Sequence, residues 1–246
     1  MHSVIYLIIL IFGFLFPLES FSAELPPRPS GLVAKVSLIA IGGKAVDRSE
    51  KVRILRPVRG SRTYDNQPAE MGDALEDGSR IETPKDAQVS VESVDRTTRI
   101  YLAGGTTATI ASGNEPKQSV KKKTESKIWW RKIILGEGRL WIQKLRNMAE
   151  EYRNHFDAET DGVSAYSEGT EYYVGVDEKE TTYFVYDGIV RLRNRLKGPW
   201  DELTLKKGQI VILGPGQTPD GPRLAKPGEV DSAREWKNKL EKLISR

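Results

Sequence analysis

Basic and tryptophan side chains gather in one short stretch of the chain, and their chemistry suits an anionic ligand. The stretch contains Lys121, Lys122, Lys123, Lys127, Trp129, Trp130, Arg131 and Lys132. Clustered cations attract lipid headgroups, lipopolysaccharide or the carboxylates of peptidoglycan, while indole rings stack on sugars or lie at a membrane interface. We therefore predict a basic loop, inserted at residues 114–132, that contacts an anionic polymer or lipid. The alternative is a solvated loop that leads into a strand, with Trp129 or Trp130 in the core.

Residues for catalysis or for holding a metal are scarce. The chain has no Cys and only two His, His2 and His155, so thiol nucleophiles, disulfides and thiolate zinc sites are excluded and a histidine-rich site has almost no material. Paired carboxylates could hydrolyse a glycoside, but the sequence nominates no pair among its 34 acids. We expect no enzyme activity, no cofactor and no metal. An envelope enzyme that processes glycans is the less favoured alternative.

Two small groups of residues have a ligand-binding interpretation, and we favour a structural one for both. Asp73, Glu76 and Asp77 could gather around a cation, but they adjoin glycines as turn residues do, without the spacing of a calcium loop. Gly169-Thr170-Glu171 could touch a ligand. A glycine there also permits a bulge or close approach of the next strand, which Thr170 and Glu171 would begin.

The elements that must position these residues follow a period of two. Val36, Leu38 and Ala40 alternate with other side chains, Val89 and Val91 flank Ser90, and further alternating runs follow. Glycine-containing turn signals such as 77–78, 104–105 and 187–188 separate the runs at short intervals. Many short strands at such spacing predict an all-β sandwich, barrel or solenoid.

Two segments have helical spacing instead. Within residues 142–155, Leu145, Met148 and Tyr152 fit a short helix. Near the C-terminus, Ser232 to Glu235 match a capping box, and an apolar stripe follows on a wheel whose lysines lie elsewhere: Trp236, Leu240 and Leu243, with Lys237, Lys239 and Lys242 off the stripe. We expect this short amphipathic helix to pack onto its own β domain and not onto a second chain.

The N-terminus predicts export. Val4 to Phe16 is almost wholly apolar but shorter than the roughly 20 residues of a spanning helix, and it suits the apolar part of a signal peptide cut after Ser22. An uncleaved anchor is the alternative. We expect a signal peptide at 1–22, a Pro-rich linker at 23–30 and a periplasmic or secreted location.

Several short motifs follow one another along the chain. It reads GDALEDGSRIET from Gly72 to Thr83, and further motifs lie at residues 87–91, 97–106, 135–140, 156–176, 186–190 and 205–209. In sequence and in order these motifs resemble those of the FecR domain family. The similarity runs from about Gly60 to Pro215. Two positions depart from it, because Asp161 replaces a usual proline and Glu168 a usual arginine.

The resemblance implies a β-solenoid-like or rolled stack of short antiparallel strands, with the short C-terminal helix added. It places an N-terminal strand region at 31–67, the FecR-like domain at 68–216, and a tail with the helix at 217–246. We expect a binding or protein-interaction module of the cell envelope. Its partner would be an envelope protein, met through strand edges, or an anionic cell-wall or lipid polymer, including peripheral contact with a membrane.

A signalling subunit that works with a membrane partner is the alternative that the resemblance leaves open. Because the predicted signal peptide begins at residue 1, we expect no cytoplasmic domain of the kind that anti-sigma members of the family carry ahead of the exported part. We expect no nucleic acid as a partner, since the formal net charge is only +4 and an exported protein has little occasion to meet it.

Overall fold

The alternating runs form β-strands, because successive side chains of a strand point to opposite faces. The computed structural model describes residues 32–94, 96–113, 130–144, 156–167, 170–196, 198–214 and 217–245. Its 18 strands form one continuous sheet that curls into a half-barrel, with one C-terminal helix. The prediction of an all-β, rolled stack of short strands with a C-terminal helix is confirmed.

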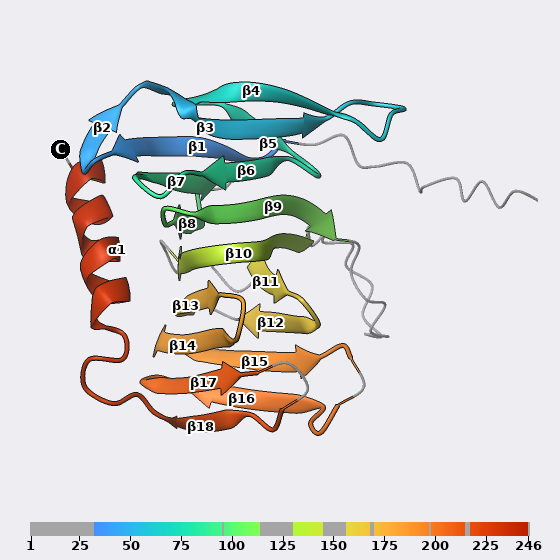
Figure 1. The fold of residues 1–246 in the computed structure, drawn as a ribbon, viewed down its shortest axis with the longest axis vertical. Coiled ribbons are helices and arrows are strands. Elements are labelled where there is room, and N and C mark those ends of the chain that lie inside the picture. Colours follow the sequence, from blue (N-terminus) through green and yellow to red (C-terminus); the bar gives the residue numbers. More distant parts are fainter. Residues whose placement is uncertain are drawn as a thin grey trace, which may run out of the picture.

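The continuous sheet has two walls, which we call sheet A and sheet B. They face each other in the half-barrel, and the strands stack along its long axis (Figure 1). Sheet A contains β1 (Leu32–Ile41), β2 (Lys44–Val46), β5 (Ala74–Glu76), β7 (Ala87–Ser93), β8 (Thr98–Leu102), β13 (Glu171–Val176), β14 (Thr181–Asp187), β17 (Gln209–Leu213) and β18 (Asp220–Leu224). Sheet B contains β3 (Arg48–Pro57), β4 (Tyr64–Glu70), β6 (Arg80–Thr83), β9 (Thr106–Gly113), β11 (Phe156–Thr160), β12 (Val163–Ser167), β15 (Ile189–Asn194) and β16 (Glu202–Lys206).

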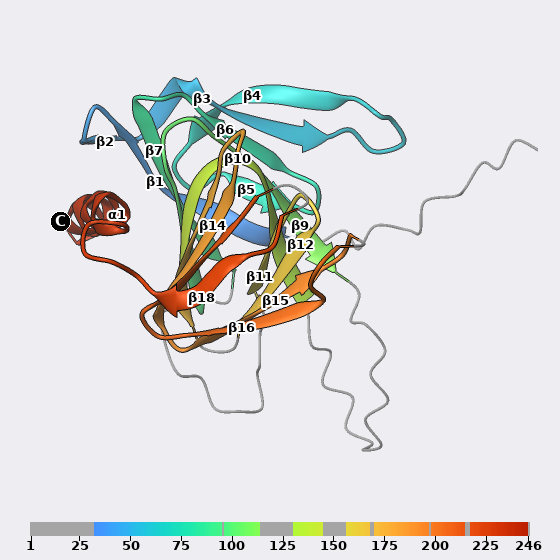
Figure 2. The same ribbon diagram turned by 60° about the horizontal axis from the view of Figure 1, so that its bottom comes forward.

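The long strand β10 (Trp130–Lys144) belongs to both walls. Its first half pairs with β9 and runs parallel to β11, and its second half pairs with β8 and β13. Figure 2 shows β10 arching from one wall to the other. At the corner, Gly138 has φ +94°, and a Cβ atom there would lie 2.6 Å from the carbonyl oxygen of Gly105. Only glycine fits this corner.

The space between the walls is filled by apolar side chains from both sheets. Val89, Ile100 and Leu140 of sheet A meet Ile54 and Ile110 of sheet B in one buried cluster. A β-bulge in β1 changes which side chains join it, since the register shifts between Val36 and Leu38. Val36 and Ile39 therefore face the inter-wall core, whereas Leu38 and Ala40 face outward.

The outer face of sheet A is covered by α1 (Asp231–Ile244). Aromatic side chains of the sheet, among them Tyr101, Trp141 and Phe184, pack against Trp236 and Leu240 of the helix. This confirms that the helix packs onto its own β domain.

A buried lysine joins the helix to the sheet. Lys237 Nζ lies 2.9 Å from Glu171 Oε1 and 2.9 Å from Glu241 Oε1. The indole Nε1 of Trp141 donates to the same Glu171 oxygen at 2.8 Å, and the ammonium lies 5.6 Å from the Trp141 ring centroid. These contacts explain the burial of a charged side chain, because each charge has a partner.

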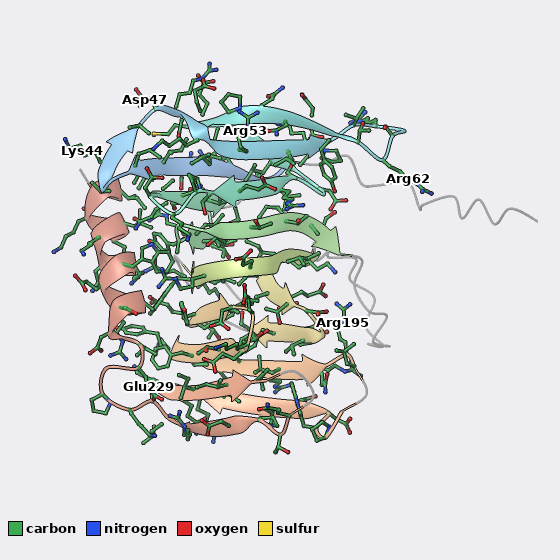
Figure 3. All side chains as sticks on the ribbon, viewed as in Figure 1. Lys44, Asp47, Arg53, Arg62, Arg195 and Glu229 are labelled. Atoms are coloured by element: carbon green, nitrogen blue, oxygen red, sulfur yellow. The ribbon has the colours of Figure 1, made fainter. Side chains whose placement is uncertain are left out.

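The β3–β4 hairpin projects beyond the rest of the half-barrel (Figure 2). Its turn, residues 58–63, is closed by a hydrogen bond from Val58 N to the carbonyl oxygen of Thr63 at 3.1 Å. Figure 3 labels Arg62 at its end.

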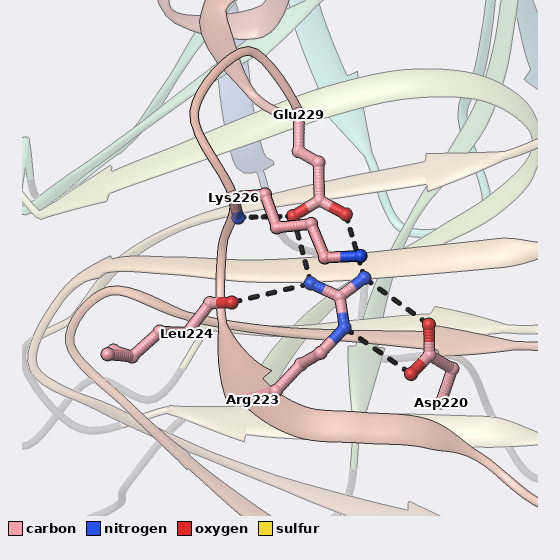
Figure 4. A network of polar contacts seen from close by, with 5 residues as sticks. All are labelled: Asp220, Arg223, Leu224, Lys226 and Glu229. Carbon is pink, nitrogen blue, oxygen red and sulfur yellow. Dashed lines mark hydrogen bonds and ion pairs between the residues drawn. The ribbon is translucent and has the colours of Figure 1, made fainter.

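The link between β18 and α1 is fixed by Arg223 (Figure 4). Its Nη2 lies 2.7 Å from Glu229 Oε1 and 3.3 Å from Asp220 Oδ2. Glu229 also accepts a hydrogen bond from the backbone of Lys226. The network sets the position at which the helix begins.

Several predictions about these elements are corrected. The expected helix from Ile142 is wrong at its start, because Ile142 to Lys144 complete β10 and pair with β8; residues 145–155 lie outside the described part. The C-terminal helix begins at Asp231, with Val230 as N-cap and no side-chain cap bond, so the capping box at Ser232 does not form. Lys237 is buried, although the helical wheel put it off the apolar stripe.

Other predictions fall outside the described residues. These are the signal peptide at 1–22, the linker at 23–30 and most of the basic loop. The predicted boundary between residues 67 and 68 falls within β4. Among the residues that the structure describes, no helix has the length and apolar character needed to cross a bilayer.

Candidate binding surface

The predicted basic loop is visible only at its C-terminal end. Lys121, Lys122, Lys123, Lys127 and Trp129 lie outside the described residues. Trp130 and Arg131 begin β10, opposite Gly113 and Ser112 of β9. Lys132 follows, and because the next residue, Ile133, is buried in the inter-wall core, strand alternation directs Lys132 to the outer face of sheet B.

Two cations share one carboxylate on this face. Lys132 Nζ lies 3.0 Å from Glu159 Oε2, and Arg195 Nη1 lies 2.9 Å from Glu159 Oε1. Burial alone would raise the pKa of Glu159, but the two cations together hold that pKa below its usual value. Glu159 is therefore ionised at neutral pH and fixes both cations in place.

A row of arginines continues from this cluster along β15. Val190 and Leu192 are buried in the core, so Arg191 and Arg193 point outward, and both are exposed. Arg195 follows directly after the strand and is labelled in Figure 3. Alternate residues of a strand stand about 7 Å apart. We call Arg191, Arg193 and Arg195 the arginine row.

Two acids lie beside the row: Glu159, which binds Arg195, and Glu202, which lies opposite Arg193. Arg191 pairs in register with Tyr166 and Thr204, and Arg193 pairs with Ser164 and Glu202. Within the described part of the chain, no ion pair joins Arg191 or Arg193 to a carboxylate. Their guanidinium groups are thus available to an outside anion.

Sequence reasoning missed this row. The signal was visible, because arginines recur at every second position from 191 to 195, with Leu192 and Asn194 between them. Elsewhere in the chain the same alternation indicates only a strand.

A buried acid lies close to the cluster. Asp157 is only 3% exposed, and its Oδ1 accepts a hydrogen bond from Ser167 N at 3.4 Å. Burial raises the pKa of Asp157 to about 8, so the carboxyl group is mostly protonated at neutral pH. A protonated Asp157 carries no negative charge, so it does not offset the positive charge of the neighbouring Lys132.

The small polar groups singled out in the sequence have structural partners. Asp73 Oδ1 lies 2.8 Å from Arg56 Nη2, and Asp77 Oδ1 accepts a hydrogen bond from Ser112 N at 2.6 Å. Glu171 begins β13 and holds Lys237, and Thr170 donates to the carbonyl oxygen of Ile189 at 2.9 Å. Among the described residues, no cluster of His, Asp and Glu suits a metal ion.

Comparisons with known proteins give limited similarity. No protein-family model matches the chain, and no curated protein matches it. Two crystal structures titled "putative anti-sigma factor", both from Parabacteroides distasonis ATCC 8503, are similar in structure. One, at 2.50 Å resolution, has a TM-score of 0.42 and 16% identity, covering 59% of this chain and 60% of that chain. The other, at 1.65 Å, has a TM-score of 0.44 and 15% identity, covering 68% and 75%.

The chain thus spans about 60% of the length of the first of these structures. Similarity at this level assigns no activity to the chain. Membership of the FecR family stays a prediction from the order of motifs in the sequence.

Proposed function

We propose that this chain is a non-catalytic binding module of the cell envelope, which meets an acidic partner through the arginine row. The contrast between the two outer faces carries the proposal. The outer face of sheet A is apolar and lies under α1, whereas the outer face of sheet B presents exposed Arg191 and Arg193.

The chemistry of arginine favours a carboxylate or phosphate ligand. A guanidinium group is charged at all relevant pH values and binds such anions through two parallel hydrogen bonds. A row with a spacing of about 7 Å suits a polymer with recurring anionic groups, such as an acidic cell-wall polymer. The predicted basic loop directly precedes β10 in the sequence, and its lysines are a second candidate for the same ligand.

The experiment is co-sedimentation of the chain from residue 23 onward with purified sacculi at rising salt. We expect Arg191→Glu/Arg193→Glu to abolish most of the retention, and a second variant with Lys121, Lys122 and Lys123 changed to Glu to reduce it. Lys239→Glu/Lys242→Glu is the matched control, because it makes the same change of charge at exposed positions of α1. Equal retention of the control and the arginine-row variant would refute the proposal.

If the chain is instead a signalling subunit, the alternative that the sequence leaves open, the arginine row binds one envelope protein and not the sacculus. A single envelope protein would then be retained at high salt by the wild-type chain, and sacculi would not compete for it. The arginine-row variant would lose that protein as well.

A further inference from the structure

We propose that the tip of the β3–β4 hairpin, residues 58–64, docks on a membrane surface that carries anionic phospholipid headgroups. This contact goes beyond the proposed function, because it uses another part of the molecule and another ligand.

The tip exposes two large apolar side chains. Val58 is 41% exposed and Tyr64 is 48% exposed, one on each side of the turn. The hairpin projects away from the half-barrel (Figure 2), so these side chains can meet a flat surface without interference from the body. A tyrosine ring has an apolar body and a polar hydroxyl, which suits the boundary between headgroups and acyl chains.

Two arginines lie between these apolar residues. Arg59 and Arg62 are exposed, and within the described residues neither forms an ion pair with a carboxylate. The turn from 58 to 64 contains no acid, and the acid that follows, Asp65, accepts a hydrogen bond from Gln67 Nε2 at 2.6 Å. The tip therefore combines two cations with apolar surface, as membrane-surface segments do.

The turn is held in one shape before it binds. Ser61 N donates to the carbonyl oxygen of Val58 at 3.1 Å, and Thr63 N donates to Ser61 Oγ at 3.1 Å. Pro57 and Tyr64 are paired across the ribbon. Little conformational entropy is lost on docking when a loop is already ordered.

The tip lies at the end of the half-barrel where the described chain begins. Strand pairing passes from Leu55 to Arg80 and then to Thr109, so β3 and β9 run in the same direction and the tip lies at the end of β9. Ser112 of β9 binds Asp77, next to Glu76, which pairs with Leu32. The hairpin tip and the start of β1 therefore share one end.

The sequence before Leu32 agrees with a bilayer at this end. The apolar stretch from Val4 to Phe16 is followed by residues 17–31, which span at most about 50 Å when extended. If that stretch is retained as an anchor, it and the hairpin tip reach the same bilayer. If it is removed as a signal peptide, the hairpin supplies a contact that the mature chain keeps.

The test is flotation of the chain from residue 23 onward with vesicles of 30% phosphatidylglycerol and 70% phosphatidylethanolamine. Each cation near such a surface changes the partition constant about fivefold, so Arg59→Glu/Arg62→Glu should lower it by at least about 30-fold. Val58→Ser/Tyr64→Ser should lower it severalfold without a change of charge. An unfolding temperature equal to that of the wild type shows that each variant keeps its fold.

Two controls separate this inference from the proposed function. Lys239→Glu/Lys242→Glu carries the same change of charge at exposed positions of α1 and should float like the wild type, while Leu224→Ser removes an apolar side chain that is 72% exposed elsewhere and should also float normally. Quenching of a Tyr64→Trp variant by brominated lipid should exceed that of the wild type. Unchanged flotation of both hairpin variants, or an equal loss in the Lys239→Glu/Lys242→Glu variant, would overturn the inference and leave the sacculus experiment unaffected.

Discussion

Replacement of Asp157 by Asn should change how the stability of the protein depends on pH. Asp157 is buried, and burial raises its pKa from 3.8 to about 8. In the unfolded chain the same carboxyl group titrates near its ordinary value. The folded state therefore keeps a proton that the unfolded state releases between about pH 4 and pH 8.

The sign of the effect follows from this difference in bound protons. Stability rises with pH only where the unfolded state binds more protons, and here the folded state binds more. The contribution of Asp157 is fully favourable below about pH 4 and is lost as the pH rises towards 8. At 1.36 kcal/mol per pH unit, the interval from 3.8 to about 8 corresponds to a loss of up to about 6 kcal/mol.

Asparagine removes the titration and keeps the shape. Its side-chain oxygen can still accept the hydrogen bond from Ser167 N, which Asp157 accepts at 3.4 Å. Relative to the wild type, Asp157→Asn should therefore gain only about 1 kcal/mol at pH 4.5 and several kcal/mol at pH 9.

The assay is urea unfolding followed by tryptophan fluorescence at pH 4.5, 7 and 9. The quantity of interest is the difference in the free energy of unfolding between variant and wild type, in which all other titrating groups cancel. A difference that stays constant across the three pH values would refute the reasoning, because it would mean that Asp157 is ionised in the folded protein at neutral pH.

Further predictions concern the corner of β10 and the attachment of α1. Gly138→Ala should lower the free energy of unfolding by more than about 2 kcal/mol, since φ is +94° and the new Cβ would meet backbone. The control Gly136→Ala, with its nearest atom at 3.7 Å, should lower it by under about 1 kcal/mol. Equal costs in urea unfolding would contradict the corner geometry. Lys237→Met should cost about 3 kcal/mol because it leaves Glu171 and Glu241 without their shared cation. The control Lys239→Met breaks an exposed pair with Glu235 and should leave the stability nearly unchanged. Calorimetry that found the two costs alike would argue against a buried Lys237.

Much of the fold could be predicted from local pattern, and its corners could not. Alternation at Val89, Val91, Ile100 and Leu102 predicts strands with one buried face, which the structure has. The same pattern does not say which strand passes from one wall to the other. That depends on Gly138, whose need for glycine arises from contact with residues 105 and 106, about thirty positions earlier in the chain.

The binding surface was harder to predict for a related reason. A cluster of adjacent lysines in the basic loop is conspicuous in sequence, whereas the arginine row gains its meaning from the exposed position of β15 in sheet B. Lys237 shows the reverse case. A helical wheel places it off the apolar stripe, but Glu171 lies on the sheet beneath and draws the ammonium inward.

The attachment of α1 also sets the order in which the molecule can be completed. The helix is the last described element, yet it packs on Leu38 and Ala40 near the beginning of the chain. Tyr101, Trp141 and Phe184 therefore stay uncovered while the polypeptide is being synthesised, until the residues of α1 arrive. A chain truncated before Asp231 would present this aromatic surface permanently, and chaperones and proteases that bind exposed apolar segments could recognise it as incomplete.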